Sequence, residues 1–67
     1  MKNLIKVERA RNNITQAELA DRVKVSRQTI NSIETGRFIP SALLAFKIAH
    51  VLDRTVDEVF QLEDADW

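Results

Sequence analysis

Polar side chains recur at helical spacing between residues 27 and 35, and their types suit binding to the edges of bases. On a helix, Ile30 and Ile33 would share one side. The opposite side would carry only hydrogen-bonding, non-acidic residues: Arg27, Gln28, Asn31, Ser32 and Thr35. An arginine guanidinium pairs with guanine O6 and N7, and a glutamine or asparagine amide pairs with adenine N6 and N7. The pattern therefore indicates a surface suited to the major groove of double-stranded DNA.

Further polar residues flank this segment, where they could reach phosphates. Gln16 opens the preceding helical segment, whose N-terminal amides and dipole would favour a phosphate, and Arg37 follows the polar helix. Phosphate contacts set register, whereas base contacts set sequence preference. We predict base contacts from Arg27, Gln28, Asn31 and Ser32, with the N-terminal pair deepest in the groove. We predict phosphate contacts from Gln16, Lys24, Ser26, Thr29, Thr35 and Arg37.

Residues 16–36 read as two short helices joined by a tight turn. Thr15 with Glu18 three residues later forms a capping box, which predicts a helix over 16–23. Ser26 suits an N-cap and Gly36 suits a helix stop, so a second helix is predicted from residue 27 to about 35. Two helices this short bury little of each other, but such a pair can place one polar face in a DNA groove.

The remaining segments predict three more helices in a single domain spanning residues 1–67. The first is amphipathic and ends near Asn12, and a capping box at Thr55 opens another over 56–60. Between them, Ser41 caps a strongly apolar segment that we expect to be the central core helix: Ala42, Leu43, Ala45, Phe46, Ile48, Ala49 and Leu52. Residues 60–62 could pair with residues 1–3 as short strands. We therefore expect an all-α fold of five helices, with a possible β ribbon between the two ends of the chain.

Composition argues against several kinds of site. The chain has no cysteine and a single histidine, so it cannot form a disulfide and offers too few ligands for a structural zinc site. It has one glycine, so no glycine-rich phosphate loop is possible, and it shows no nucleophile elbow. We expect no cofactor, no metal, no small-molecule ligand and no enzymatic activity.

Charge is unevenly distributed although the formal net charge is zero. Residues 1–37 carry eight basic and four acidic side chains, and residues 38–67 carry two basic and six acidic ones. The basic half contains the two-helix segment, as expected for a surface that meets nucleic acid. The longest apolar run, residues 42–46, is too short for a membrane span, and charges interrupt the first eleven residues. We expect a soluble cytoplasmic protein.

The chain resembles the phage-repressor/Cro-type (lambda repressor-like) helix-turn-helix family. The matching segments are Gln16-Ala17-Glu18-Leu19-Ala20, Val25-Ser26-Arg27-Gln28-Thr29-Ile30, Ile33-Glu34-Thr35-Gly36-Arg37 and Pro40-Ser41, and the likeness extends over nearly all 67 residues. It is strongest to minimal, single-domain members. Lys24 departs from the pattern, because the family often has glycine at this turn position, where the backbone tends toward left-handed φ.

The resemblance implies a symmetric homodimer that binds a palindromic operator, as a transcriptional repressor. By this likeness Gln16 touches phosphate, while Arg27, Gln28 and Ser32 read bases; Asn31 comes from helical spacing alone. We place the dimer surface in the C-terminal half of the chain, at Phe38, Ile39, Val59 and Leu62.

Several alternatives remain open at this point. The same module could belong to an antitoxin that also neutralises a toxin, or to a protein-interaction module that binds no DNA. Phe38 and Ile39 could be core residues or an exposed apolar loop, and Glu34 could pair with Arg9 or Arg37. The acidic end of the chain could be a solvated tail or a regulatory mimic of DNA.

Overall fold

Local capping signals begin four of the five helices of the computed structural model, which describes residues 1–67. The helices are α1 (Ile5–Asn12), α2 (Gln16–Val23), α3 (Arg27–Glu34), α4 (Ala42–Val51) and α5 (Val56–Val59). In α2 the Thr15 side chain accepts from the Glu18 backbone N–H at 3.0 Å, while the Glu18 carboxylate accepts from the Thr15 N–H at 2.9 Å. The Ser26 and Ser41 side chains cap α3 and α4 by accepting from the Thr29 and Leu44 backbone N–H groups, without the reciprocal carboxylate bond. No helix has both the length and the apolar character that crossing a membrane requires.

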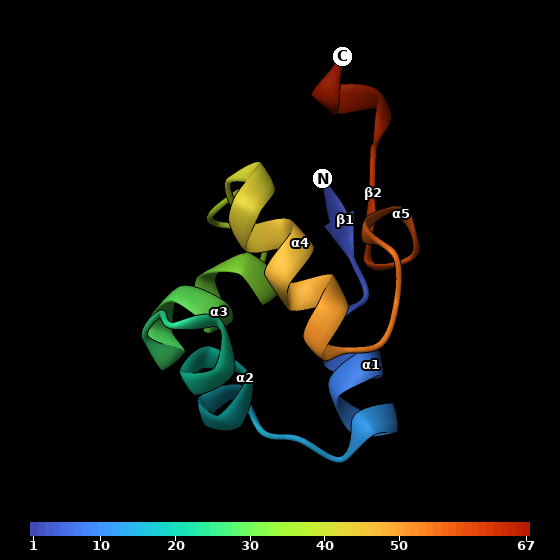
Figure 1. Ribbon diagram of the computed structural model, residues 1–67. Helices are drawn as coiled ribbons and strands as arrows, with labels where there is room; N and C mark the ends of the chain where they lie inside the picture. Colours follow the sequence, from blue (N-terminus) through green and yellow to red (C-terminus); the bar gives the residue numbers. More distant parts are fainter.

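The core lies where the inner faces of all five helices meet. α4 runs through the middle of the molecule in Figure 1, with α2 and α3 to one side and the strands with α5 to the other. The buried apolar residues come from every helix and from the start of the second strand: Ile5, Leu19, Ala20, Val23, Ile30, Ile33, Ala45, Ile48, Ala49, Leu52, Val59 and Phe60. Burial of Leu19, Ile30 and Ile33 agrees with the helical spacing of the sequence and fixes which side of α3 faces solvent.

A two-stranded antiparallel ribbon joins the two ends of the chain, as the sequence analysis suggested. β1 (Lys2–Asn3) pairs with β2 (Phe60–Gln61), with Lys2 opposite Gln61. Beyond β2, residues Asp64–Asp66 form a short 3-10 helix, η1. The Met1 amine lies 3.0 Å from the Asp66 carboxylate and 3.2 Å from that of Glu63, and hydrogen bonds to these groups raise the pKa of the amine. The acidic end is thus held against the N-terminal strand.

α3 ends as predicted, with Thr35 as its C-cap and Gly36 directly after it. Two expectations need correction. α5 ends at Val59, one residue before the predicted end, because the Phe60 backbone is extended and enters β2. α4 is only partly a core helix. Its side chains Leu43 and Phe46 are 67% and 64% exposed, although both are large and apolar. Apolar residues surround this helix, so helical spacing alone did not distinguish its buried side from its exposed side.

Candidate nucleic-acid interface

The solvent-facing side of α3 brings together the residues predicted to contact bases. Ile30 and Ile33 are 0% and 2% exposed, which turns the opposite side of the helix outward. Arg27, Gln28 and Asn31 are exposed there, and Ser32 is half-buried at the edge of the face. The side chains of Arg27 and Gln28 have no hydrogen-bond or ion-pair partner within the chain, so their donors and acceptors are free for a ligand.

An ion pair behind α3 removes the only negative charge of this helix from the exposed face. The Arg9 guanidinium, on α1, grips the Glu34 carboxylate in a fork, with Nε–Oε2 at 2.9 Å and Nη2–Oε1 at 3.1 Å. Arg9 also donates to the Ile14 carbonyl at 3.2 Å. The Glu34 side chain is 7% exposed and that of Arg9 is 16% exposed, so water screens the pair weakly. Glu34 thus pairs with Arg9, and Arg37 stays unpaired.

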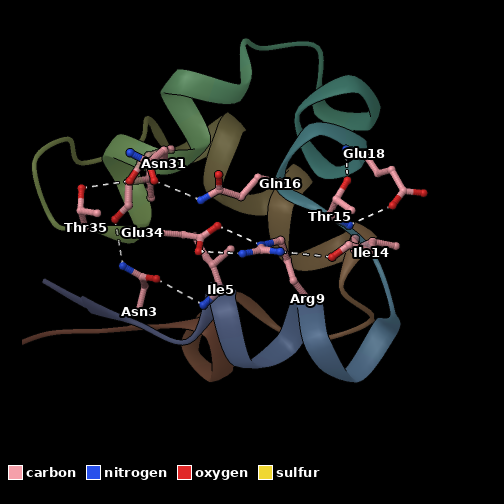
Figure 2. A network of polar contacts seen from close by, with 11 residues as sticks. Asn3, Ile5, Arg9, Ile14, Thr15, Gln16, Glu18, Asn31, Glu34 and Thr35 are labelled. Atoms are coloured by element: carbon pink, nitrogen blue, oxygen red, sulfur yellow. Dashed lines mark hydrogen bonds and ion pairs between the residues drawn. The ribbon is translucent and has the colours of Figure 1, made fainter.

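Two more polar contacts hold α3 in place, and Figure 2 shows them with the ion pair. The Asn3 amide donates to the Ile33 carbonyl at 3.0 Å, and its oxygen accepts from the Ile5 N–H at 3.2 Å. β1 and the start of α1 are thereby tied to the end of α3. On the outer side, Gln16 Nε2 at the start of α2 donates to Asn31 Oδ1 at 3.2 Å. Sequence reasoning missed Asn3, because only the β ribbon brings it near α3.

The hydroxyl groups predicted to contact phosphate differ in whether their protons are already used in hydrogen bonds within the chain. Ser26 Oγ accepts from the Thr29 backbone N–H at 3.1 Å and lies 2.9 Å from Thr29 Oγ1. One hydroxyl proton serves that mutual bond, so the pair has one proton left for an outside acceptor. The Thr35 hydroxyl instead donates to the Asn31 carbonyl at 2.9 Å. Its proton is engaged inside the helix, which makes Thr35 the least suited of the predicted phosphate contacts.

The two basic candidates at the margins are exposed, and neither forms an ion pair. Lys24 ends α2 with φ +64°, the left-handed conformation in which the family resemblance places glycine. A lysine there carries a backbone cost of about 1 kcal/mol. Gly36, at φ +80°, closes α3 without that cost and turns the chain toward Arg37. Basic side chains therefore lie beyond the C-terminal ends of both α2 and α3.

Residues 5–59 match a family model described as Helix-turn-helix. The chain belongs to this helix-turn-helix family. The matched range contains α1 through α5 and therefore the whole exposed face of α3.

Relatives of this helix-turn-helix chain carry names that concern transcription. An uncharacterised HTH-type transcriptional regulator from Methanocaldococcus jannaschii is 48% identical over 64 residues, covering 96% of this chain and 97% of the relative. The regulator YgzD of Bacillus subtilis is 44% identical over 64 residues, with the same coverage. Among solved structures, the clp gene regulator ClgR from Corynebacterium glutamicum matches with a TM-score of 0.76 and 30% identity. That match spans 81% of this chain and 57% of the ClgR chain.

The residues predicted to form a dimer surface divide into two groups in this helix-turn-helix domain. Phe38, Ile39 and Leu62 are exposed. Val59 is 0% exposed because α5 packs it into the core of its own chain, so assigning it to a subunit interface was wrong. Leu43 and Phe46 of α4 are exposed as well, and we call the side of the helix that carries them the outer face of α4. The sequence signal for these two residues is the apolar character of the helix on both its buried and its exposed sides.

Proposed function

We propose that this protein is a DNA-binding transcriptional regulator that reads base edges with the outer face of α3. The observation that carries the proposal is that this face is exposed, free of acidic groups and supported from behind by the Arg9–Glu34 pair. Membership in the helix-turn-helix family and the names of the relatives support the same function. A non-enzymatic role fits these names.

The proposed contacts follow from the exposure of each side chain. Arg27, Gln28, Asn31 and Ser32 read bases, because they lie on the face that points away from the core. Gln16, Lys24, Arg37 and the Ser26–Thr29 hydroxyl pair contact phosphates at the margins of this face. Thr35 contributes only if its hydroxyl leaves the Asn31 carbonyl.

We further propose that the regulator is a homodimer that represses transcription by occupying a palindromic operator. One short helix contacts only a few base pairs, whereas a two-fold pair of recognition helices about 34 Å apart reads two half-sites. The exposed apolar residues support a contact between copies on the loop after α3, the outer face of α4 and the segment after β2: Phe38, Ile39, Leu43, Phe46 and Leu62. Burying them in a dimer would remove this apolar surface from water.

Selection of bound duplexes from a random pool, at a stated salt concentration, tests the proposed function. We expect enrichment of a palindrome whose half-sites are about one helical turn apart. Enrichment of a single, non-repeated site would support DNA reading but contradict the homodimer. A pool without enrichment would contradict sequence-specific binding altogether.

A further inference from the structure

The segment after β2, residues 62–67, is ordered and carries the largest exposed apolar side chain of the molecule. We call this segment the tail. Trp67 is 91% exposed, and Figure 1 shows the tail extending away from the helices. The tail is nevertheless held at its base, because the Asp66 carboxylate accepts from the Glu63 backbone N–H at 2.8 Å and lies 3.0 Å from the Met1 amine. The indole is therefore presented outward from a fixed support, which lowers the entropy cost of binding it.

A hollow between α4 and α5 has the size and the lining to take an aromatic side chain. Its volume is about 280 Å³. A cavity of about 150 Å³ is already large enough to hold a benzene ring. An indole is apolar with a single N–H donor, and it packs well against aromatic rings and guanidinium groups. The hollow offers both kinds of group, because three apolar and three polar residues line it: Phe46, Ala49, Val56, His50, Arg54 and Thr55.

The tail and the outer face of α4 carry opposite charges. α4 contains no acidic residue, and its exposed Lys47 forms no ion pair within the chain. The tail contains three acidic residues and no basic one, and its Asp64 forms no ion pair. Arg54 is already paired with Glu8 and Glu58, so the unpaired positive charge beside the hollow lies on α4. Electrostatic attraction therefore favours a tail that approaches along this helix.

We infer that Trp67 of one copy occupies the hollow between α4 and α5 of a second copy, and that the exchange is reciprocal. In its own chain the indole is 91% exposed and lies outside the hollow, so a tail from another copy is the occupant. A two-fold axis then gives two such contacts in each dimer. This inference rests on the proposed homodimer and deepens it, because it names the side chain that each copy contributes and the place that receives it.

Fluorescence of the full chain tests this exchange, because Trp67 is the only tryptophan and the chain has no tyrosine. We expect its emission to shift to shorter wavelength, and its quenching by acrylamide to weaken, as the protein concentration rises through the monomer–dimer range found by sedimentation. Trp67→Ala should raise the Kd of the dimer by about tenfold or more. Lys47→Glu should also weaken the dimer, because it repels the acidic tail. Val7→Ser, on α1, is the control and should leave the shift unchanged.

A mixture of two variants tests whether the indole crosses between chains. Phe46→Asp removes an apolar group from the hollow and repels the acidic tail, and circular dichroism should show an unchanged fold because Phe46 is 64% exposed. Alone, this variant should show the emission of an exposed indole. Excess Trp67→Phe contributes no tryptophan signal but keeps the hollow intact, so it should restore the shift to shorter wavelength.

The possible failures can be told apart. A dimer whose Trp67 emission stays that of an exposed indole overturns the inference while the homodimer stands. The same holds if the indole is buried at every protein concentration, if excess Trp67→Phe restores nothing, or if Trp67→Ala and Lys47→Glu both leave the Kd unchanged. Sedimentation of the wild type as a monomer overturns the homodimer and this inference with it.

Discussion

At the scale of single residues, the structure separates side chains that are free from those that are already engaged. Arg27 and Gln28 are exposed and have no partner in the chain, whereas Glu34 is turned inward against Arg9. Sequence spacing predicted this division, because two isoleucines are enough to orient a short helix. It could not predict the partner of Glu34, because Arg9 and Arg37 were equally available along the chain.

Gln28→Ala tests the reading of bases by the exposed side of α3. Losing a two-point contact with one base should weaken binding to the preferred site by about 1–3 kcal/mol and reduce discrimination at one base position. Titration of the preferred duplex and of single-base variants measures both effects. Equal affinity for all duplexes before and after the change would contradict the assignment of Gln28 to a base.

Arg37→Ala tests the assignment of an exposed cation to the DNA backbone. Removing one phosphate contact should weaken binding to all duplexes by a similar factor and make the salt dependence shallower by about one unit of slope. Affinities measured over a series of salt concentrations give this slope. If the preferred site weakens far more than unrelated duplexes do, Arg37 reads a base instead.

At the scale of elements, helix boundaries were the most predictable feature, because caps are local. Thr15, Ser26 and Ser41 begin their helices as predicted, each with its side chain accepting from the backbone N–H three residues on. The end of α5 was not predictable to the residue, because pairing of Phe60 in β2 competes with continuing the helix. The exposed side of α4 was not predictable either, because its apolar residues lie all around the helix.

The Arg9–Glu34 ion pair joins α3 to α1. The Arg9→Ala variant measures how much this pair contributes to the free energy of unfolding. The substitution leaves a nearly buried carboxylate without its partner, so we expect the free energy of unfolding to fall by about 3 kcal/mol in urea titrations. Arg9→Lys is the matched control, because it keeps the charge but loses the two-pronged geometry, and it should cost about half as much. Equal stability of the wild type and Arg9→Ala would show that the pair does not hold α3.

The two capping boxes predict a loss of stability in acid. Hydrogen bonds from the Thr15 backbone N–H and side chain lower the pKa of Glu18, and those from Thr55 lower the pKa of Glu58, both from 4.5. Because the pKa values are lower in the folded state, the carboxylates contribute stability that is present above about pH 4.5. This stability is lost as the pH falls through the folded-state pKa values.

Thermal melting as a function of pH checks the contribution of these carboxylates. The wild-type melting temperature should fall below pH 4.5, and the double variant Glu18→Gln/Glu58→Gln should show a shallower fall over the same range. Asp66, whose pKa is lowered from 3.8 by the Glu63 backbone N–H and by the Met1 amine, adds a contribution that the variant retains. Parallel pH profiles for the two proteins would contradict the role of the capping boxes.

At the scale of the whole molecule, a small core is combined with several large apolar side chains that are exposed. A chain of 67 residues buries a modest share of its surface on folding. The apolar residues at Phe38, Ile39, Leu43 and Phe46 nevertheless remain open to solvent, on the loop before α4 and on α4 itself. An additional subunit would cover such a surface and help stabilise a domain of this size.

Leu43→Ser/Phe46→Ser tests whether this surface joins two copies. Both side chains are exposed in the single chain, so the double variant should keep its helical circular dichroism but sediment as a monomer at concentrations where the wild type is a dimer. Val7→Ser is the matched control, because Val7 is 55% exposed but lies on α1, and it should leave the dimer intact. Wild-type sedimentation as a monomer would contradict the proposed homodimer.

We propose that the outer face of α3 is the surface that meets DNA, and a nuclear magnetic resonance titration checks this placement residue by residue. An isotope-labelled sample is titrated with a short duplex at low ionic strength, and the shifts of backbone and side-chain amides are followed. We expect the largest shifts at the start of α2 and at four residues of α3: Arg27, Gln28, Asn31 and Ser32. Largest shifts on the outer face of α4, or no shifts at saturating duplex, would contradict it.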